Sequence, residues 1–287
     1  MIPSMAVHHH HHRQHAGWTR RLLIGAAVVL ALLVLGVPTA IVFVHAFGKG
    51  IEGWWRAISQ PEALHAVFLS LLTVAIVVPV NAVYGLSVAW AVTKFRWQGK
   101  KWLVSLIEVP FSVSPIVAGV ATLMVYGTSG LFGGWLMDHD LKIMFAVPGI
   151  ILATLFVTSP FVAREVMPLM QLQGTDEEEA AQVLGAGGLK TFLAVTLPNV
   201  KWALFYGLIL CAARSLGEFG AVSVVSGHIR GETNTLPLYI DLLYHDYDSS
   251  GAFAAASVLT LLALVTVILK GVVEGRRDTA LGDEPGE

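Results

Sequence analysis

Six long, apolar and nearly uncharged runs divide this sequence, and they constrain its fold more than any other feature. Each run is as long as the stretch of about 20 residues that a helix needs to cross a bilayer. The runs cover residues 22–46, 65–92, 102–126, 143–163, 202–226 and 251–273. Only 13% of the 287 residues are charged, against about 25% in soluble domains. The sequence therefore predicts an all-α, polytopic membrane protein with six transmembrane helices.

The first run needs separate treatment, because it follows Arg20 and Arg21 and could be mistaken for a signal peptide. Its apolar stretch is longer than the 7–15-residue core of such signals, and no small-residue cleavage site follows it. We interpret it as a span. Five histidines at positions 8–12 are either an expression tag or part of a natural tail. The predicted parts are an N-terminal tail (1–21), a transmembrane domain (22–273) containing a long loop (164–201), and a C-terminal tail (274–287).

The distribution of basic residues predicts the orientation of the spans. Lys and Arg are enriched in cytoplasmic connections. Thirteen of the 18 lie in the two tails and in the connections after the second and fourth runs. Four lie on the opposite side, and Arg214 lies within the fifth run. Both termini and the 164–201 loop are therefore predicted to be cytoplasmic.

The 164–201 loop carries signals for ordered structure. Thr175 followed by Glu178 has the spacing of a capping box, which favours a helix start. Gly185 suits the C-terminal cap of that helix. A second short helix is expected to follow and to stop at Pro198, because proline cannot continue a helical hydrogen-bond ladder. The loop is thus predicted to be a pair of short helices joined by a glycine-rich turn.

Seven residues of this loop keep the spacing of a known motif. Three residues separate Glu179-Ala180-Ala181 from Gly185, nine separate Gly185 from Val195, and one separates Val195 from Leu197-Pro198. This pattern resembles the EAA motif of bacterial ABC importer permeases, with Val195 in place of the usual isoleucine. The resemblance implies a type I importer permease (MetI-like) fold. It also implies that this loop couples the permease to a separate ATPase.

One stretch superficially resembles a phosphate-binding loop. The segment 185–191 is rich in glycine and ends in Lys190-Thr191, but Leu189 stands where that motif requires glycine. We therefore expect no ATP site and no cofactor in this chain. ATP and Mg²⁺ are expected to bind to the partner ATPase.

Two charged residues fall within the fifth run. Arg214 lies 12 residues beyond Trp202, which is about 18 Å along a helix and near the bilayer midplane. Such charges usually pair and face the bundle interior, and Glu218 follows four residues later on the same predicted helix face. The pair either fixes helix packing or, through Arg214, lowers the barrier for an anion.

The third run contains residues that interrupt a helix, namely Pro110, Ser114, Pro115 and Gly119. Irregular backbone is tolerated in a membrane where it is buried in protein or lines a watery path. The segment resembles the proline-rich third span of sulfate and molybdate permeases, which lines the path in that group. A simple packing kink is the other interpretation.

Residues 213–222 resemble the sulfate/molybdate permease group, and residues 223–237 are similar to W-type subunits of sulfate/thiosulfate importers. The resemblance implies a bacterial inner-membrane complex. It contains an unlike CysT-type permease, two ATPase copies and a periplasmic sulfate/thiosulfate-binding protein. Transport of molybdate, tungstate or another oxyanion stays an alternative. A secondary transporter would be expected to show an internal repeat, and none is found.

Enzyme and metal chemistry lack the residue clusters they need. Cys211 is the single cysteine and lies in an apolar run, which excludes a disulfide framework and a multi-cysteine metal site. The acidic and histidine residues at 138–140 and 245–248 lie in polar connections, and we expect them to be solvated rather than metal-bound. We therefore predict a transport subunit without a catalytic site.

Overall fold

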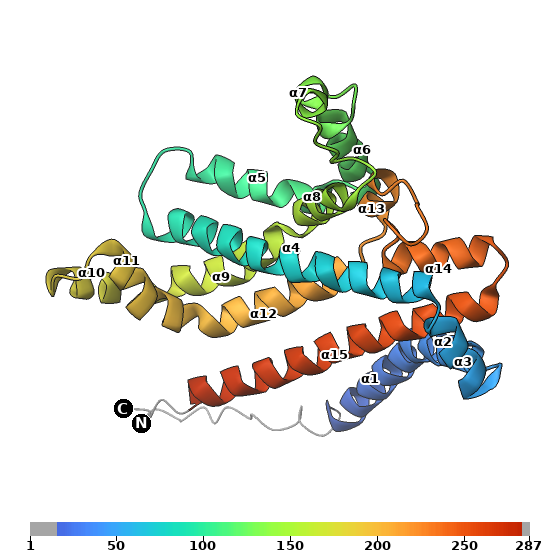
Figure 1. The fold of residues 1–287 in the computed structure, drawn as a ribbon. Coiled ribbons are helices and arrows are strands. Elements are labelled where there is room, and N and C mark those ends of the chain that lie inside the picture. The colour runs from blue at the N-terminus through green and yellow to red at the C-terminus, as the bar shows by residue number, and fades with distance from the viewer. Residues whose placement is uncertain (1–15, 283–287) are drawn as a thin grey trace, which may run out of the picture.

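The computed structural model describes residues 16–282, with side chains from 18 to 275, and every described element is a helix (Figure 1). The elements within the apolar runs are α1 (Ala16–Ala31), the π-helical turn η1 (Leu32–Gly36), α2 (Val37–Ala46), α4 (Pro61–Lys94), α5 (Lys100–Ser112), α6 (Pro115–Tyr126), α8 (Val147–Thr158), α9 (Pro160–Gln173), α12 (Leu197–Leu216) and α15 (Ser249–Gly282). The connecting elements are α3 (Gly50–Ile58), α7 (Gly133–Asp138), α10 (Asp176–Val183), α11 (Gly188–Thr191), the π-helical turn η2 (Phe192–Thr196), α13 (Gly220–Val225) and α14 (Leu236–His245). The five-histidine run lies outside the described residues.

Six membrane spans agree with the sequence prediction if one bent helix pair counts as a single span. In the described residues, five continuous helical stretches are long and apolar enough to cross a bilayer. They are Trp18–Ala46, Pro61–Lys94, Val147–Gln173, Gly188–Leu216 and Ser249–Gly275. The sixth candidate is the pair α5–α6, whose axes differ by 112°.

The predicted interruption of the third run is therefore confirmed, and it takes the form of a sharp bend between two helices. The bend falls at Val113 and Ser114, directly before Pro115. A residue before proline is pushed out of the α region, and Ser114 has φ −59° and ψ 139°. Pro110 does not interrupt the chain, because it lies inside α5. Of the two prolines expected to break the helix, only Pro115 does so.

Two other span boundaries were wrong. The fourth span was expected to end at 163, but α9 continues to Gln173. The fifth was expected to run to 226, but α12 ends at Leu216 and a separate helix, α13, begins at Gly220. The predicted 164–201 loop therefore starts inside a helix, and only residues 174–187 lie outside the two long helices that flank it.

The core of the bundle lies where α4, α9 and α12 meet. A Cβ atom placed on Gly85 of α4 would lie 2.7 Å from the Cβ of Val162, and one on Gly207 of α12 would lie 3.1 Å from its Cα. Small residues of this kind let membrane helices approach closely and gain dispersion contacts. Asn81 adds a polar link, because its side chain donates to Thr158 Oγ1 at 2.7 Å and contacts Cys211 Sγ at 3.4 Å.

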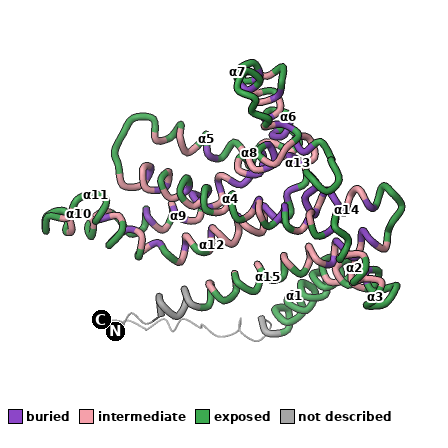
Figure 2. The backbone as a smooth tube through the Cα atoms, in the orientation of Figure 1, coloured by how far each residue is buried: buried purple, intermediate pink, exposed green. Residues whose placement is uncertain are grey.

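The connecting elements gather at opposite ends of the bundle. Helices α10 and α11 project from one end, while α3 and α14 lie at the other (Figure 1). Helix α1 is exposed from Trp18 onward and diverges from the bundle, whereas α2 packs on α15 (Figure 2). The short pair α10–α11 is thus presented as a separate projection at the end of α9 and α12.

Candidate functional site

The helix α10 and its turn hold the first half of the EAA-like motif. Gly174 precedes α10 with φ 68° and ψ −152°, a backbone conformation that essentially only glycine adopts. After α10, Gly185 has φ 86° and donates to the carbonyl of Gln182 at 2.9 Å, and Ala186 donates to that of Ala181 at 3.0 Å. These two bonds form a Schellman motif, which satisfies the last carbonyls of a helix. The predicted C-terminal cap at Gly185 is confirmed.

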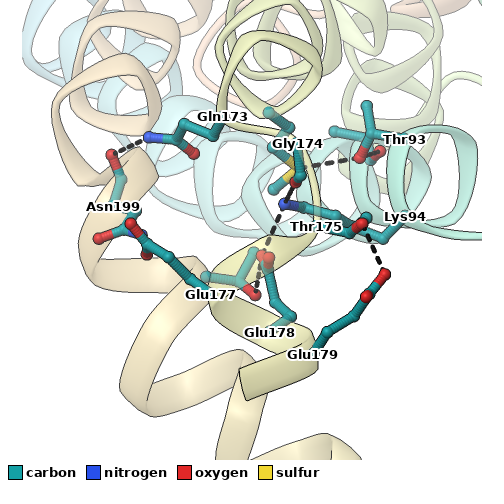
Figure 3. A network of polar contacts seen from close by, with 12 residues as sticks. Thr93, Lys94, Gln173, Gly174, Thr175, Glu177, Glu178, Glu179 and Asn199 are labelled. Carbon is teal, nitrogen blue, oxygen red and sulfur yellow. Dashed lines mark hydrogen bonds and ion pairs between the residues drawn. The ribbon is translucent and has the colours of Figure 1, made fainter. Parts of the chain in front are cut away.

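The predicted capping box is absent. Thr175 does stand at the N-cap position, but its side chain makes no capping hydrogen bond to the backbone. Its hydroxyl instead donates to Glu179 Oε1 at 2.8 Å. Glu178 is free to point elsewhere and pairs with Lys94 (Figure 3). A tertiary ion pair has therefore replaced the local capping contact.

Three side chains from neighbouring elements bind two glutamates of α10. Lys94 Nζ lies 2.6 Å from Glu178 Oε1, and the Thr196 hydroxyl donates to the same oxygen at 3.0 Å. On the other side of the helix, the Asn199 amide donates to Glu177 (Figure 3). These contacts join α10 to the end of α4 and to the start of α12.

The environment of Glu178 favours its charged form. Partial burial by itself raises the pKa of this carboxyl group, but hydrogen bonds from Lys94 and Thr196 act in the opposite direction and outweigh it. The net pKa lies below its ordinary value because donors to the carboxylate stabilise the anion. Glu178 is therefore ionised at neutral pH.

The second half of the motif lies on a continuous helix rather than on a short one. Helices α11, η2 and α12 run without a break from Gly188 to Leu216. Pro198 therefore does not stop the helix as predicted, because it stands in the first turn of α12 after a π-helical turn, where the backbone tolerates a missing N–H. Val195 and Leu197 are half-buried, and Pro198 is exposed.

The tip of the projection exposes large apolar side chains. Val183, Leu184 and Leu189 have 87%, 88% and 72% of their surface exposed. Glu179 and Ala180 are exposed beside them, while Ala181 is half-buried. Val183 and Leu184 lie outside the candidate spans, and Leu189 lies at the start of the Gly188–Leu216 stretch. Exposed apolar side chains of this kind are typical of surfaces that contact another protein or a membrane. We call Val183, Leu184 and Leu189 the apolar tip.

The predicted path residues lie mostly at a junction of two broken helices. Gly119 of α6 is buried, and a Cβ there would lie 2.6 Å from the carbonyl oxygen of Ala221 in α13. A Cβ on Gly220 would lie 3.0 Å from the Cβ of Pro115. Pro115 and Gly119 therefore touch α13 directly. Ser114 is exposed at the bend, and Pro110 lies apart in α5.

Arg214 and Glu218 form the predicted ion pair at the same junction, with 2.6 Å between Nη2 and Oε2. The Glu218 side chain is 1% exposed and that of Arg214 is 31% exposed. Glu218 does not belong to the same helix as expected, because α12 ends at Leu216. Its other oxygen accepts the backbone N–H of Ala221 at 2.8 Å. Glu218 therefore joins the end of α12 to the start of α13.

Sequence reasoning missed several residues that position this site. In the sequence analysis, Lys94 contributed only to the count of basic residues that predicts the orientation. No role was predicted for Thr196, Asn199 or Gly174. No local pattern links Lys94 to Glu178, because the two are 84 positions apart in the chain. Gly174 carried a weak signal, since glycine before an N-cap position marks a turn.

Comparison with known proteins adds a family and a fold. Residues 81–279 match the family described as binding-protein-dependent transport system inner membrane component. The chain is 50% identical over 254 residues to the sulfate transport system permease protein CysW of Escherichia coli K12, covering 88% of this chain and 87% of that one. The CysT permease protein of the same strain is 32% identical over 253 residues, covering 88% and 91%.

A solved structure shares the fold. A chain of the bacterial alginate ABC transporter, in complex with an alginate pentasaccharide-bound periplasmic protein, superposes with a TM-score of 0.73 at 14% sequence identity. The match covers 89% of this chain and 92% of that chain. The all-helical fold is therefore that of type I ABC importer permeases, as the sequence predicted.

Proposed function

The chain belongs to the binding-protein-dependent transport system inner membrane component family, and on this premise we propose that it is a permease subunit of an ABC importer for sulfate and thiosulfate. It forms part of the translocation path and couples that path to a separate ATPase. The single observation that carries the coupling role is the apolar tip on α10–α11. Val183 and Leu184 of this tip lie outside the candidate spans, between Ala181 and Gly185 of the EAA-like motif.

The apolar tip supports docking to another protein. Val183 and Leu184 flank the Schellman turn, whose glycine fixes their direction. Burying a leucine-sized side chain contributes about 1.5–3 kcal/mol, so three such side chains supply a useful part of a binding interface. The projection formed by α10–α11 can also transmit a rigid-body movement, because it is helical, whereas a disordered loop cannot. We assign ATP and Mg²⁺ binding to the ATPase that binds the α10–α11 projection.

The assembly is proposed to contain two unlike permeases. Relatives of this chain carry two different names, CysW and CysT, at 50% and 32% identity. Their co-occurrence in one bacterial strain supports a heterodimer of this chain with a CysT-type subunit, two ATPase copies and a periplasmic binding protein. Closure of the ATPases around ATP brings the α10–α11 projection of this chain toward the corresponding projection of the second permease. The helices then rock between inward-facing and outward-facing states.

The orientation follows from the distribution of basic residues. The tip of α10–α11 and both chain termini are assigned to the cytoplasm, and α3, α7 and α14 to the periplasmic side of a bacterial inner membrane. Introduced cysteines test this assignment, because Cys211 is buried. Gln182→Cys, at an exposed position of α10 outside the apolar tip, should react with a membrane-impermeant thiol reagent only after the cell is opened. Met137→Cys in α7 is the matched control, since its position is exposed, and it should react in intact cells.

Arg214 and Glu218 have two possible roles at the junction of α12 and α13. The nearly full burial of Glu218 and its bond to Ala221 support a packing role. The partial exposure of Arg214 supports a contribution to an anion path, although its paired carboxylate offsets the positive charge. We propose packing as the main role, with Ser114, Pro115 and Gly119 placed beside the path.

Sulfate uptake in a strain that lacks its own sulfate permease is the decisive functional test. Expression of this chain together with its partner subunits should restore uptake of labelled sulfate. Rescue of molybdate uptake alone would replace sulfate with another oxyanion. Purification of this chain without any associated ATPase, together with transport that needs no nucleotide, would remove the ABC importer assignment.

A further inference from the structure

A half-buried ion pair connects α10 to a helix that does not belong to the EAA-like segment. Lys94 is the last residue of α4, the second span. Its Nζ lies 2.6 Å from Glu178 Oε1, and the two side chains are only 7% and 13% exposed (Figure 3). Most ion pairs at protein surfaces are well solvated and contribute little. This pair is shielded from solvent, so it holds its two helices together more firmly.

Lys94 and Glu178 each make a second contact that fixes their position. The Lys94 ammonium group also donates to the carbonyl oxygen of Gly174, the residue at the start of the turn into α10. Glu178 Oε1 accepts the hydroxyl of Thr196, which is 1% exposed. Lys94 therefore holds both the turn before α10 and the first turn of α10 itself.

The helix end that carries Lys94 is itself firmly packed. The Thr93 hydroxyl lies 3.4 Å from the sulfur of Met170, which is buried in α9. The Trp90 ring packs on Phe192 of η2, with 4.9 Å between ring centroids. Since α4 is held to α9 and η2 by these contacts, a displacement of Lys94 moves the whole cytoplasmic end of α4.

Separation of the pair is costly, which makes it suited to transmitting force. Removing one partner of a fully buried ion pair costs about 3–5 kcal/mol. An exposed pair contributes about 0–1 kcal/mol, and this half-buried pair falls between the two. A displacement of α10 by a bound partner therefore takes Lys94 with it instead of breaking the contact. Along the backbone, α10 is connected only to α9 and α12. The ion pair adds a third mechanical connection, from α10 to α4.

We propose that Lys94 is a positioning residue that transmits the displacement of α10 to the second membrane span. The proposal rests on the function proposed above, in which α10 docks on an ATPase. It extends the coupling element beyond the EAA-like residues to a lysine at the end of another span. Loss of the ion pair should let the ATPase cycle with a weaker movement of α4, because only the packing of α4 on α9 and η2 then remains.

The test uses the complete complex in proteoliposomes and measures ATP hydrolysed per sulfate ion imported. Lys94→Met should assemble and hydrolyse ATP, with that ratio raised at least about 5-fold, the lower end of typical coupling effects. The exchanged pair Lys94→Glu/Glu178→Lys should recover much of the loss. Lys101→Met is the matched control, because Lys101 is an exposed lysine at the start of α5 on the same side.

A distance measurement keeps the proposal testable if Lys94→Met assembles poorly. Spin labels at Gln182→Cys in α10, which is exposed and outside the apolar tip, and at Val83→Cys in α4, also exposed, should keep a constant separation when ATP is added to the otherwise unaltered complex. Lys94→Arg should preserve this behaviour, and Glu178→Gln should make the separation depend on nucleotide.

Two results would overturn the proposal. One is an unchanged ratio of ATP to sulfate in Lys94→Met, and the other is an α10–α4 distance that changes with nucleotide in the unaltered complex. Failure of the function itself gives a different result. In that case the unaltered complex shows no ATP-dependent sulfate import, whatever residue stands at position 94.

Discussion

The two ends of α12 are held to their neighbours in different ways. At its start, long polar side chains reach across gaps, as in the contacts of Thr196 with Glu178 and of Asn199 with Glu177. Just beyond its end, backbones approach directly, and Gly119 leaves no room for a Cβ beside Ala221. Long side chains can adjust to small movements, whereas a backbone contact through glycine cannot. The first end is therefore suited to transmit motion, and the second is intolerant of added volume.

The largest effect is expected at the glycine contact. Gly119→Leu should destabilise the protein by about 1–3 kcal/mol or more, because overpacking a tight site forces the backbone to shift. A Cβ at this position would also lie 2.9 Å from the Cβ of Val224. Thermal unfolding of the purified protein in detergent measures the effect. Gly134→Leu is the control, since a Cβ there meets no atom within 4 Å.

The next largest effect concerns the ion pair beyond the end of α12. Glu218→Gln should lower stability by about 1–2 kcal/mol, less than Gly119→Leu, because Arg214 loses its carboxylate partner while its guanidinium, 31% exposed, stays partly solvated. The glutamine keeps an oxygen that can accept the Ala221 N–H. Arg214→Met combined with Glu218→Gln should restore most of the stability.

The same double variant separates the two roles of Arg214. Recovery of both stability and sulfate uptake means that the pair serves packing. A stable double variant that imports no sulfate means that Arg214 serves the anion path. A double variant as unstable as Glu218→Gln alone would contradict the ion-pair explanation itself.

At the end of the bundle that carries α10, Gly185→Asp should act on coupling more than on folding. A non-glycine residue in this left-handed conformation costs about 1–2 kcal/mol, which distorts the turn behind the apolar tip. We expect normal insertion, continued ATP hydrolysis and loss of sulfate uptake. Gly187→Ala should have a far smaller effect, because Gly187 has φ −71° and ψ 159°, which any residue adopts. Normal uptake by Gly185→Asp would argue against the turn as a coupling element.

The ion pair of Glu178 should make the attachment of α10 depend on acid. The pKa of this carboxyl group is lower in the folded protein than its ordinary value of 4.5. The resulting stability is present above the ordinary pKa and is lost as the pH falls through the lowered value. Hydrogen exchange of residues 174–187 should therefore show constant protection from pH 8 to about pH 5. Glu178→Gln should remove the acid-dependent loss that follows at lower pH.

The smallest effect is expected for Thr175→Ala. A side chain that caps a helix contributes about 1 kcal/mol, but the Thr175 hydroxyl contacts Glu179 instead of the backbone. We therefore expect a loss below about 0.5 kcal/mol, as for an ordinary surface substitution. Hydrogen exchange of the α10 amides measures it. A loss of a full capping contribution would mean that the capping box forms in solution.

The membrane spans and the coupling motif could be predicted from the sequence because their signals are local. The length of the apolar runs was enough to locate the spans. Gly185 predicted a left-handed C-terminal cap, because no other residue adopts that conformation as easily. Span boundaries were less accurate. The sequence stays apolar past Leu216 although the helix ends there, since hydropathy does not distinguish a continuous span from two helices that meet inside the bundle.

Local composition and spacing therefore determined the fold class, the number of spans and the position of the glycine turn at 185. Only the tertiary structure decided which partner each polar side chain takes. The spacing of Thr175 and Glu178 predicts a local capping box, yet Glu178 pairs with Lys94 from another span. The reason is physical, because a charged partner in a shielded site stabilises a carboxylate more than a neutral local contact does.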